Sequence, residues 1–151
     1  MPHSTFVGFD SAWTDNQKSP GAICAIRQVG SKIHSVKEPR LVNFSAALAF
    51  IRSVYDPDRV TIIGFDQPTI VPNDTGCRPV GRAVGSLVSW LGGGAQPANR
   101  GRARMFDKSA PVWKFLDQLK AIEHPERART EEAGLFILEV FPALALASMN
   151  V

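Results

Sequence analysis

The sequence predicts an α/β domain built on a mixed five-stranded β-sheet with strand order 3-2-1-4-5, flanked by helices. Two observations indicate this class. Three strand-like runs follow one another with short connections, as in an antiparallel meander. Two further apolar runs then alternate with amphipathic helical patterns, as in a parallel sheet. Because a strand–helix–strand connection is almost always right-handed, we expect strands one, four and five to form a parallel core, with the other two strands along one edge.

The meander is expected at residues 5–9, 21–28 and 32–37. The first run is apolar and ends on Asp10, and the second is followed by a turn at Gly30. The third run alternates polar and apolar residues, which is typical of a half-exposed strand.

A helix followed by a buried strand is expected next. After Asn43, a suitable N-cap, apolar residues recur on one helical face up to Tyr55, and the sequence Asp-Pro-Asp at 56–58 ends the helix. The run at 60–65 is apolar nearly throughout, as in a parallel strand buried on both faces, and it ends on Asp66.

Residues 75–106 are expected to form a Gly/Arg-rich insertion or loop. They contain seven of the twelve glycines, and a short helix is expected only around residues 82–91. Every charged residue in this segment is an arginine, namely Arg78, Arg82, Arg100, Arg102 and Arg104.

The last two elements are a helix and a strand. Ser109 is expected to cap a helix with Pro111 in its first turn and apolar residues on one face as far as Ile122. A polar stretch then leads to a fifth strand at 135–138, which Glu139 interrupts.

Length and composition are those of a folded protein in which residues 1–151 form one domain. The hydrophobic content of 44% and charged content of 21% argue against a disordered chain or a fibre. The formal charge of +3 permits a polyanionic partner without requiring one. The two cysteines, Cys24 and Cys77, are expected to be reduced thiols of a cytoplasmic protein. The most apolar stretch, at 135–147, is shorter than the ~20 residues that span a bilayer, so no membrane partner is expected.

Three carboxylates are expected at one edge of the sheet. Ligands of open α/β sheets bind at the carboxyl ends of the parallel strands, where the strand order changes direction. Asp10, Asp66 and Glu139 stand at or just after the ends of the three parallel strands. Such carboxylates are poorly solvated and repel one another, and Mg²⁺ or Mn²⁺ would relieve both costs. The alternative is that these are ordinary turn, cap or edge residues.

Four motifs in order resemble the RNase-H-like nuclease family known as domain of unknown function 429. They are Val-Gly-Phe-Asp-Ser-Ala-Trp at 7–13, Gly-Phe-Asp-Gln-Pro at 64–68, Arg-Pro at 78–79 and Glu-Val-Phe-Pro-Ala at 139–143. The resemblance covers most of the chain. It implies a ribonuclease-H-like fold in which Asp10, Asp66 and Glu139 occupy the metal-binding acidic positions.

The sequence departs from this family pattern in two places. The family often has an acidic residue shortly after its Arg-Pro motif, where this chain has Gly81. Ribonuclease-H-like folds usually add a helix after the fifth strand that brings a further acidic ligand, whereas residues 144–151 contain no acid. We therefore expect the final helix to be missing: either the chain is truncated at its C-terminus, or the acidic site is incomplete and the domain binds without cutting.

The function predicted from these features is hydrolysis of phosphodiester bonds with two divalent ions. Asp10 and Asp66 would be metal ligands, and Glu139 a third ligand or a group that orients water. The five arginines would grip the phosphates of DNA or RNA, and Trp90 and Phe106 would stack on bases. The alternatives are a non-catalytic nucleic-acid-binding module and, ranked last, an ATP-binding phosphotransferase of the actin-like branch, in which Ser11 would contact phosphate. The oligomeric state is left open.

Overall fold

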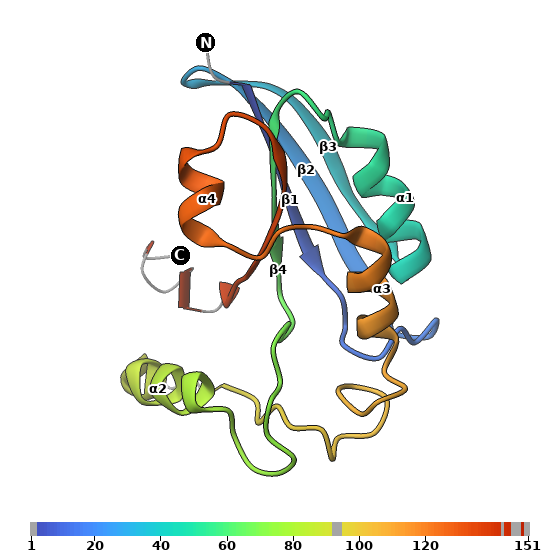
Figure 1. The fold of residues 1–151 in the computed structure, drawn as a ribbon, viewed down its shortest axis with the longest axis vertical. Helices are drawn as coiled ribbons and strands as arrows, with labels where there is room; N and C mark the ends of the chain where they lie inside the picture. Colours follow the sequence, from blue (N-terminus) through green and yellow to red (C-terminus); the bar gives the residue numbers. More distant parts are fainter. Residues whose placement is uncertain (1–2, 92–94, 143, 146–148, 150–151) are drawn as a thin grey trace.

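The structure of the chain is a computed structural model that describes residues 3–91, 95–142, 144, 145 and 149. A single five-stranded sheet in the order β3-β2-β1-β4-β5 confirms the predicted strand order (Figure 1). Its strands are β1 (His3–Asp10), β2 (Gly21–Val29), β3 (Lys32–Val42), β4 (Val60–Phe65) and β5 (Gly134–Glu139).

The pairing register brings the carboxyl ends of the parallel strands together. β1 pairs with β4 in parallel, with Phe9 opposite Phe65, and β4 pairs with β5 in parallel, with Phe65 opposite Glu139. β2 runs antiparallel to both β1 and β3. Asp10, Asp66 and Glu139 therefore lie at the same edge of the sheet, as the sequence predicts.

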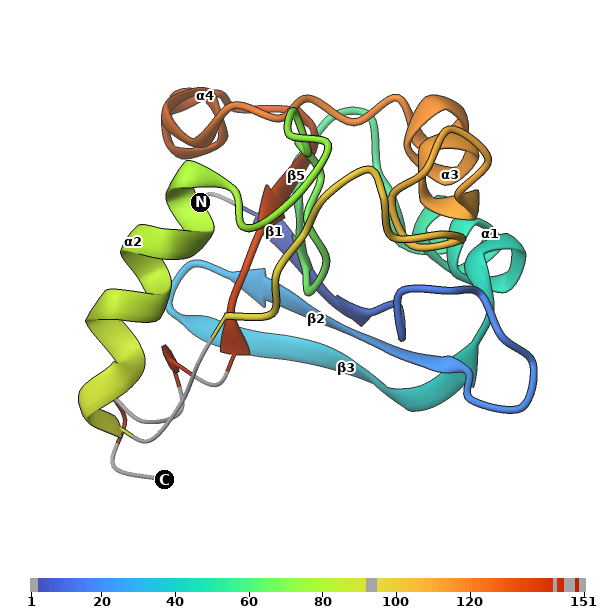
Figure 2. The ribbon, with the colours of Figure 1, turned by 90° about the horizontal axis from the view of Figure 1, so that it is seen from below.

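Two helices cover one face of the sheet (Figure 2). The helix α1 (Phe44–Val54) begins as predicted at Asn43, whose side chain accepts a hydrogen bond from the backbone N–H of Ala46. It packs beside α3 (Pro111–Leu119), and both helices bury apolar residues in the main core. The centre of that core is a cluster of phenylalanine rings with centroids 4.9–5.9 Å apart, formed by Phe9, Phe44, Phe65 and Phe115.

The short helix α4 (Pro125–Thr130) lies in the polar stretch before β5, where no helix was expected. Ala128 is its one buried residue, and it packs against Val60 and Phe136 in a second, smaller cluster. The six-residue pattern is too short and too polar for its periodicity to be recognised in the sequence.

The helix α2 (Pro79–Val88) projects away from the sheet and continues into a 3₁₀ turn at Ser89–Leu91 (Figure 1). It starts three residues before the predicted short helix, because Pro79 occupies its first turn, where a proline costs no hydrogen bond. Among the described residues, Val88 is the only one that this helix buries.

Three further expectations differ from the structure. The third strand extends to Val42 and is not limited to residues 32–37. Ala110, without a side-chain hydrogen bond, is the N-cap of α3, since the Ser109 hydroxyl instead contacts Asp107. That helix ends at Leu119, because Lys120 adopts a left-handed conformation with φ of 53°. The expected absence of a final helix concerns residues 143–151, most of which lie outside the described residues.

No helix in the described part of the chain is long and apolar enough to cross a membrane.

Gly21 permits the close approach of β2 to the end of β1, and a substitution there tests this constraint. A Cβ atom at position 21 would lie 2.2 Å from the carbonyl oxygen of Asp10, a contact that only a backbone shift can relieve. We expect Gly21→Ala to lower the free energy of unfolding by about 1–3 kcal/mol. The matched control is Gly85→Ala in α2, where a Cβ meets nothing within 4 Å. It should stabilise the protein by up to about 1 kcal/mol. Equal denaturant midpoints for Gly21→Ala and the wild type would contradict the expectation.

Candidate functional site

Asp10 and Asp66 lie at the ends of adjacent parallel strands. The backbone N–H of Asp66 donates to the carbonyl oxygen of Phe9 at 2.9 Å, which continues the β1–β4 ladder to the last residue. The Asp10 side chain is exposed, and its Oδ1 accepts a hydrogen bond from the N–H of Ala12 at 3.0 Å. Asp66 is half-buried, and its carboxylate accepts no hydrogen bond from the described residues. The oxygen atoms of the Asp66 carboxylate therefore remain free to accept a hydrogen bond or to bind a cation.

Hydrogen bonds between the turn after β1 and the chain that leaves β4 set the position of Asp10 relative to Asp66. Ala12 and Trp13 have positive φ values of 52° and 64°, a left-handed conformation that costs energy in non-glycine residues. The Trp13 indole Nε1 donates to the carbonyl oxygen of Asp66 at 3.0 Å. The buried Ser11 hydroxyl donates to Gln67, and the Gln67 amide donates to the carbonyl oxygen of Trp13 at 3.3 Å. Because Gln67 engages it, the Ser11 hydroxyl acts here as a structural group.

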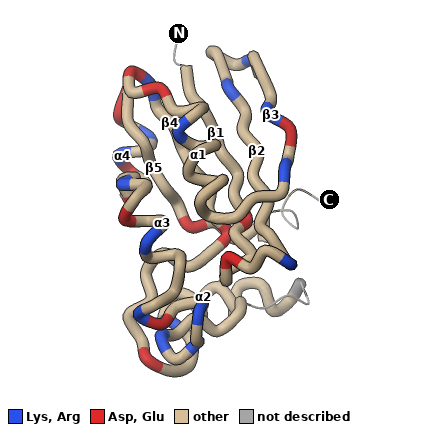
Figure 3. The backbone as a smooth tube through the Cα atoms, turned by 90° about the vertical axis from the view of Figure 1, so that its right-hand side faces the viewer, with Lys and Arg blue, Asp and Glu red and all other residues tan. Residues whose placement is uncertain are grey.

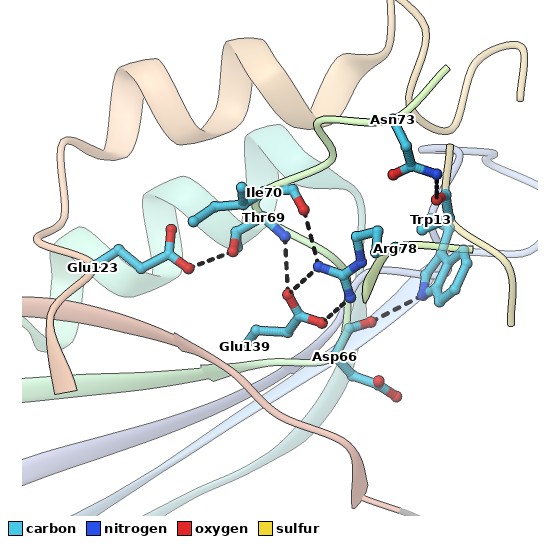
Figure 4. A network of polar contacts seen from close by, with 9 residues as sticks. Trp13, Asp66, Thr69, Ile70, Asn73, Arg78, Glu123 and Glu139 are labelled. Atoms are coloured by element: carbon cyan, nitrogen blue, oxygen red, sulfur yellow. Dashed lines mark hydrogen bonds and ion pairs between the residues drawn. The ribbon is translucent and has the colours of Figure 1, made fainter. Parts of the chain in front are cut away.

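Glu139, the third carboxylate, is paired with an arginine (Figure 4). Both terminal nitrogens of Arg78 bond the two carboxylate oxygens of Glu139, one of them at 2.8 Å. Arg78 also donates to the carbonyl oxygen of Ile70 at 3.0 Å, and the N–H of Thr69 lies 3.4 Å from Glu139 Oε2. Arg78 is 7% exposed whereas Glu139 is exposed, so the arginine predicted to bind phosphate and the glutamate predicted to bind metal form a bidentate pair that is buried on the arginine side.

The three carboxylates interact electrostatically. Burial raises the pKa of Asp66 above its ordinary value of 3.8, and the negative charges of Asp10 and Glu139 raise it further. A carboxylate that resists ionisation beside two others is an arrangement that a bound cation stabilises. Within the described residues, however, no group of three or more His, Cys, Asp or Glu side chains is close enough to hold a metal ion.

Asp10 and Asp66 could supply carboxylate oxygens of the kind that Mg²⁺ or Mn²⁺ takes as ligands. Mg²⁺ commonly takes one or two carboxylates and completes its octahedron with water and substrate phosphate. The unbonded carboxylate of Asp66 suits this role, whereas both oxygens of Glu139 already face Arg78. Glu139 therefore completes a larger metal site only if Arg78 shares or releases one of its oxygens.

The other four arginines lie in the Gly/Arg-rich segment beyond the sheet (Figure 3). Arg82 on α2 and Arg104, which has a φ of 66°, are exposed, and Arg102 is half-buried. Arg100 is exposed, but its Nε donates to the carbonyl oxygen of Val71 at 2.9 Å. None of these four forms an ion pair within the described residues. Arg82 and Arg104 are thus the arginines most available to a ligand.

The two aromatic residues predicted to stack on bases differ in exposure. Trp90 is 79% exposed, so its ring is accessible. Phe106 is 1% exposed and packs against Trp13, with ring centroids 5.4 Å apart, and against Trp113. The stacking role predicted for Phe106 is therefore wrong: its ring belongs to a small core that supports the Gly/Arg-rich segment.

Two contributors to the site are not apparent from the sequence pattern alone. Gln67 lies inside the Gly-Phe-Asp-Gln-Pro motif, but only the fold shows that its amide bridges Ser11 and Trp13. Glu123 accepts a hydrogen bond from the Thr69 hydroxyl and so brings a further carboxylate near Glu139 (Figure 4). A single Glu before α4 carries no local signal of that contact.

The chain belongs to the family described as "Protein of unknown function (DUF429)", whose model matches residues 8–151. This match includes the carboxylates, Arg78 and the whole Gly/Arg-rich segment. Neither the curated proteins nor the solved structures contain a match to the chain.

The raised pKa of Asp66 predicts a pH-dependent effect of its removal. Ionising this carboxyl is harder in the folded protein than in the unfolded chain, so it costs stability as the pH rises above 3.8. We expect Asp66→Asn to raise Tm near neutral pH, and the gain to vanish below about pH 3.8, where both states are protonated. Melting curves across the pH range measure the difference. Asp117→Asn, at an exposed position of α3, is the control, and a pH-independent gain in Asp66→Asn would refute the electrostatic cause.

Proposed function

We propose that this protein is a divalent-metal-dependent nuclease that hydrolyses phosphodiester bonds of DNA or RNA. The observation that carries the proposal is the meeting of Asp10 and Asp66 at adjacent parallel strand ends, with Glu139 close enough to raise the pKa of Asp66. The resemblance of the four motifs to this predicted RNase-H-like nuclease family supports it. A cytoplasmic location, in keeping with the free thiols of Cys24 and Cys77, belongs to the same proposal.

The proposed mechanism assigns a separate task to each group. Asp10 and Asp66 bind Mg²⁺ or Mn²⁺, which when bound supplies charge stabilisation at the phosphate and activates water. Glu139 orients the attacking water or serves as a third ligand, and in the two-ion form it gives up one of its bonds to Arg78. Water attacks phosphorus and loses one proton, the bond from phosphorus to the leaving oxygen breaks, and the leaving oxygen takes up one proton, which gives a phosphate monoester and an alcohol. The exposed Arg82 and Arg104 hold flanking phosphates.

A second candidate function is a nucleic-acid-binding module without cleavage. The Arg78–Glu139 pair favours it, because Glu139 is already neutralised without a metal ion. Thermal stabilisation by Mn²⁺ separates the two. A nuclease should gain Tm with increasing Mn²⁺ concentration, and Asp66→Asn should abolish the gain, whereas a module without a metal site should show no such dependence.

The nuclease proposal is tested with purified full-length chain, Mg²⁺ or Mn²⁺, and single-stranded, duplex and branched DNA and RNA. Loss of a metal ligand removes several kcal/mol of transition-state stabilisation. We therefore expect Asp10→Asn and Asp66→Asn to lower the cleavage rate at least ~100-fold. Asp117→Asn, on the exposed surface of α3, should cleave like the wild type. Absence of cleavage in the wild type, or undiminished cleavage in Asp10→Asn, would remove the proposal.

The phosphate contacts are tested by the salt dependence of binding. Each phosphate that a cationic side chain neutralises adds about 0.7–0.9 to the slope of log affinity against log salt. The double variant Arg82→Gln/Arg104→Gln should reduce the slope by about 1–2, since both side chains are exposed and unpaired. Arg129→Gln, exposed on α4, is the control. Equal slopes for the double variant and the wild type would show that the segment does not contact phosphate.

A further inference from the structure

A pocket that Asp66 and Glu139 help to line also has apolar walls that the proposed chemistry does not use. Its apolar walls come from segments distant in the sequence, namely the turn after β1, helix α2 and the chain leaving β5. The apolar lining residues are Trp13, Pro68, Val80, Val84, Ala95, Val140 and Phe141. Asp66, Arg78 and Glu139 line the same pocket, so an apolar surface directly adjoins the charged groups.

The polar groups of the pocket differ in whether they are free to bind a ligand. Gln67 is 1% exposed, and both ends of its amide are engaged by Ser11 and Trp13. Gln96 is exposed, and its side chain makes no hydrogen bond to the described residues. The pocket thus offers apolar walls together with one amide that has both a donor and an acceptor to spare.

The apolar surface continues along α2 beyond the pocket. Leu87 is 64% exposed and Trp90, one turn further, is 79% exposed, while Val80 at the other end of the helix is 53% exposed. All charged side chains in residues 75–106 are arginines, and one of them, Arg82, lies exposed on α2 itself, so a cationic group accompanies this apolar surface. A ligand suited to this surface combines a negatively charged group with a neighbouring flat apolar group that has hydrogen-bonding atoms along its edge.

We propose that this pocket binds an unpaired nucleobase adjacent to the phosphate held at Asp10 and Asp66, with Trp90 as a stacking platform for a neighbouring base. The inference rests on the proposed function, and it specifies the substrate class as nucleic acid with an unpaired strand. A base in a duplex is already stacked and paired, so it enters such a pocket only when flipped out or single-stranded. Apolar walls around a single free amide suit a base better than a phosphate, and the positive segment favours a polyanion over an uncharged peptide.

The test compares two short fluorescein-labelled single strands of equal charge, one with bases and one with abasic sites throughout. Binding is measured by anisotropy with Ca²⁺ in place of Mg²⁺ or Mn²⁺, so that the carboxylates keep a divalent ion, and a gel run alongside checks that both strands stay intact. We expect the wild type to bind the strand with bases at least about tenfold more tightly, the equivalent of ~1.4 kcal/mol. Equal affinities, or no binding of either strand, would overturn the proposal, and in the latter case the apolar face belongs to another kind of partner.

A matched pair of lysine variants on α2 separates the pocket from simple charge attraction. Val84→Lys places a charged chain in the pocket, whereas Ser86→Lys adds the same charge on an exposed position outside it. We expect Ser86→Lys to bind the strand with bases at least as tightly as the wild type, and Val84→Lys to bind it at least fivefold more weakly. Tighter binding by both variants would show that charge alone governs affinity and would overturn the proposal.

A variant at Trp90 covers the case in which Val84→Lys fails to fold, because this exposed side chain contributes little to the core. Trp90→Ala should reduce the preference for bases over abasic sites by at least threefold, and an unchanged preference would overturn its stacking role. The nuclease proposal is tested by separate outcomes. Cleavage that depends on Asp10 without any base preference would support the nuclease proposal and overturn the base-binding pocket. Base preference without cleavage would support the pocket and overturn the nuclease proposal.

Discussion

The ion pair between Arg78 and Glu139 connects the sheet to the Gly/Arg-rich segment. Glu139 ends β5, and Arg78 immediately precedes α2, so their two hydrogen bonds join the parallel core to the Gly/Arg-rich segment. Removing either partner would leave the other charge without compensation in a partly buried site, which is costly. The pair therefore determines where α2 leaves the core, and with it where Val84 lies relative to Asp66.

That pair also divides the acidic cluster into two parts with different chemistry. Arg78 neutralises Glu139, but it leaves Asp10 and Asp66 without a cationic partner among the described residues. Burial raises the pKa of Asp66 and the charges of Asp10 and Glu139 raise it further, while the Trp13 indole hydrogen-bonds the turn after β1 to the carbonyl oxygen of Asp66. In the function proposed above, a divalent cation supplies the charge compensation that Asp10 and Asp66 lack.

The sequence predicts the sheet order and the meeting of the carboxylates because both depend on local signals. Apolar runs mark the strands, and the handedness of strand–helix–strand connections orders them, so Asp10 and Asp66 become neighbours without knowledge of any side-chain contact. The pairing of Arg78 with Glu139 joins residues 61 positions apart, and no periodicity encodes it. For the same reason the sequence suggests that Phe106 is an accessible aromatic residue in a loop. In the structure its ring packs against Trp13, which is distant in the chain. Non-local contacts of this kind decide which residues of a predicted site remain free to bind.

The exposed face of α2 is the feature of the fold that most needs a thermodynamic explanation. Isolated helices shorter than ~12–15 residues are marginal in water, and most helices in proteins gain their stability by packing an apolar face. α2 has ten residues and buries only Val88 among the described residues, while Val80 and Leu87 face solvent. A ligand that covers this face removes apolar surface from water and stabilises the helix at the same time, so ligand binding and the order of α2 are linked. Because the N-terminus of α2 is fixed at Arg78, that linkage extends to Glu139 and so to the carboxylates at the edge of the sheet.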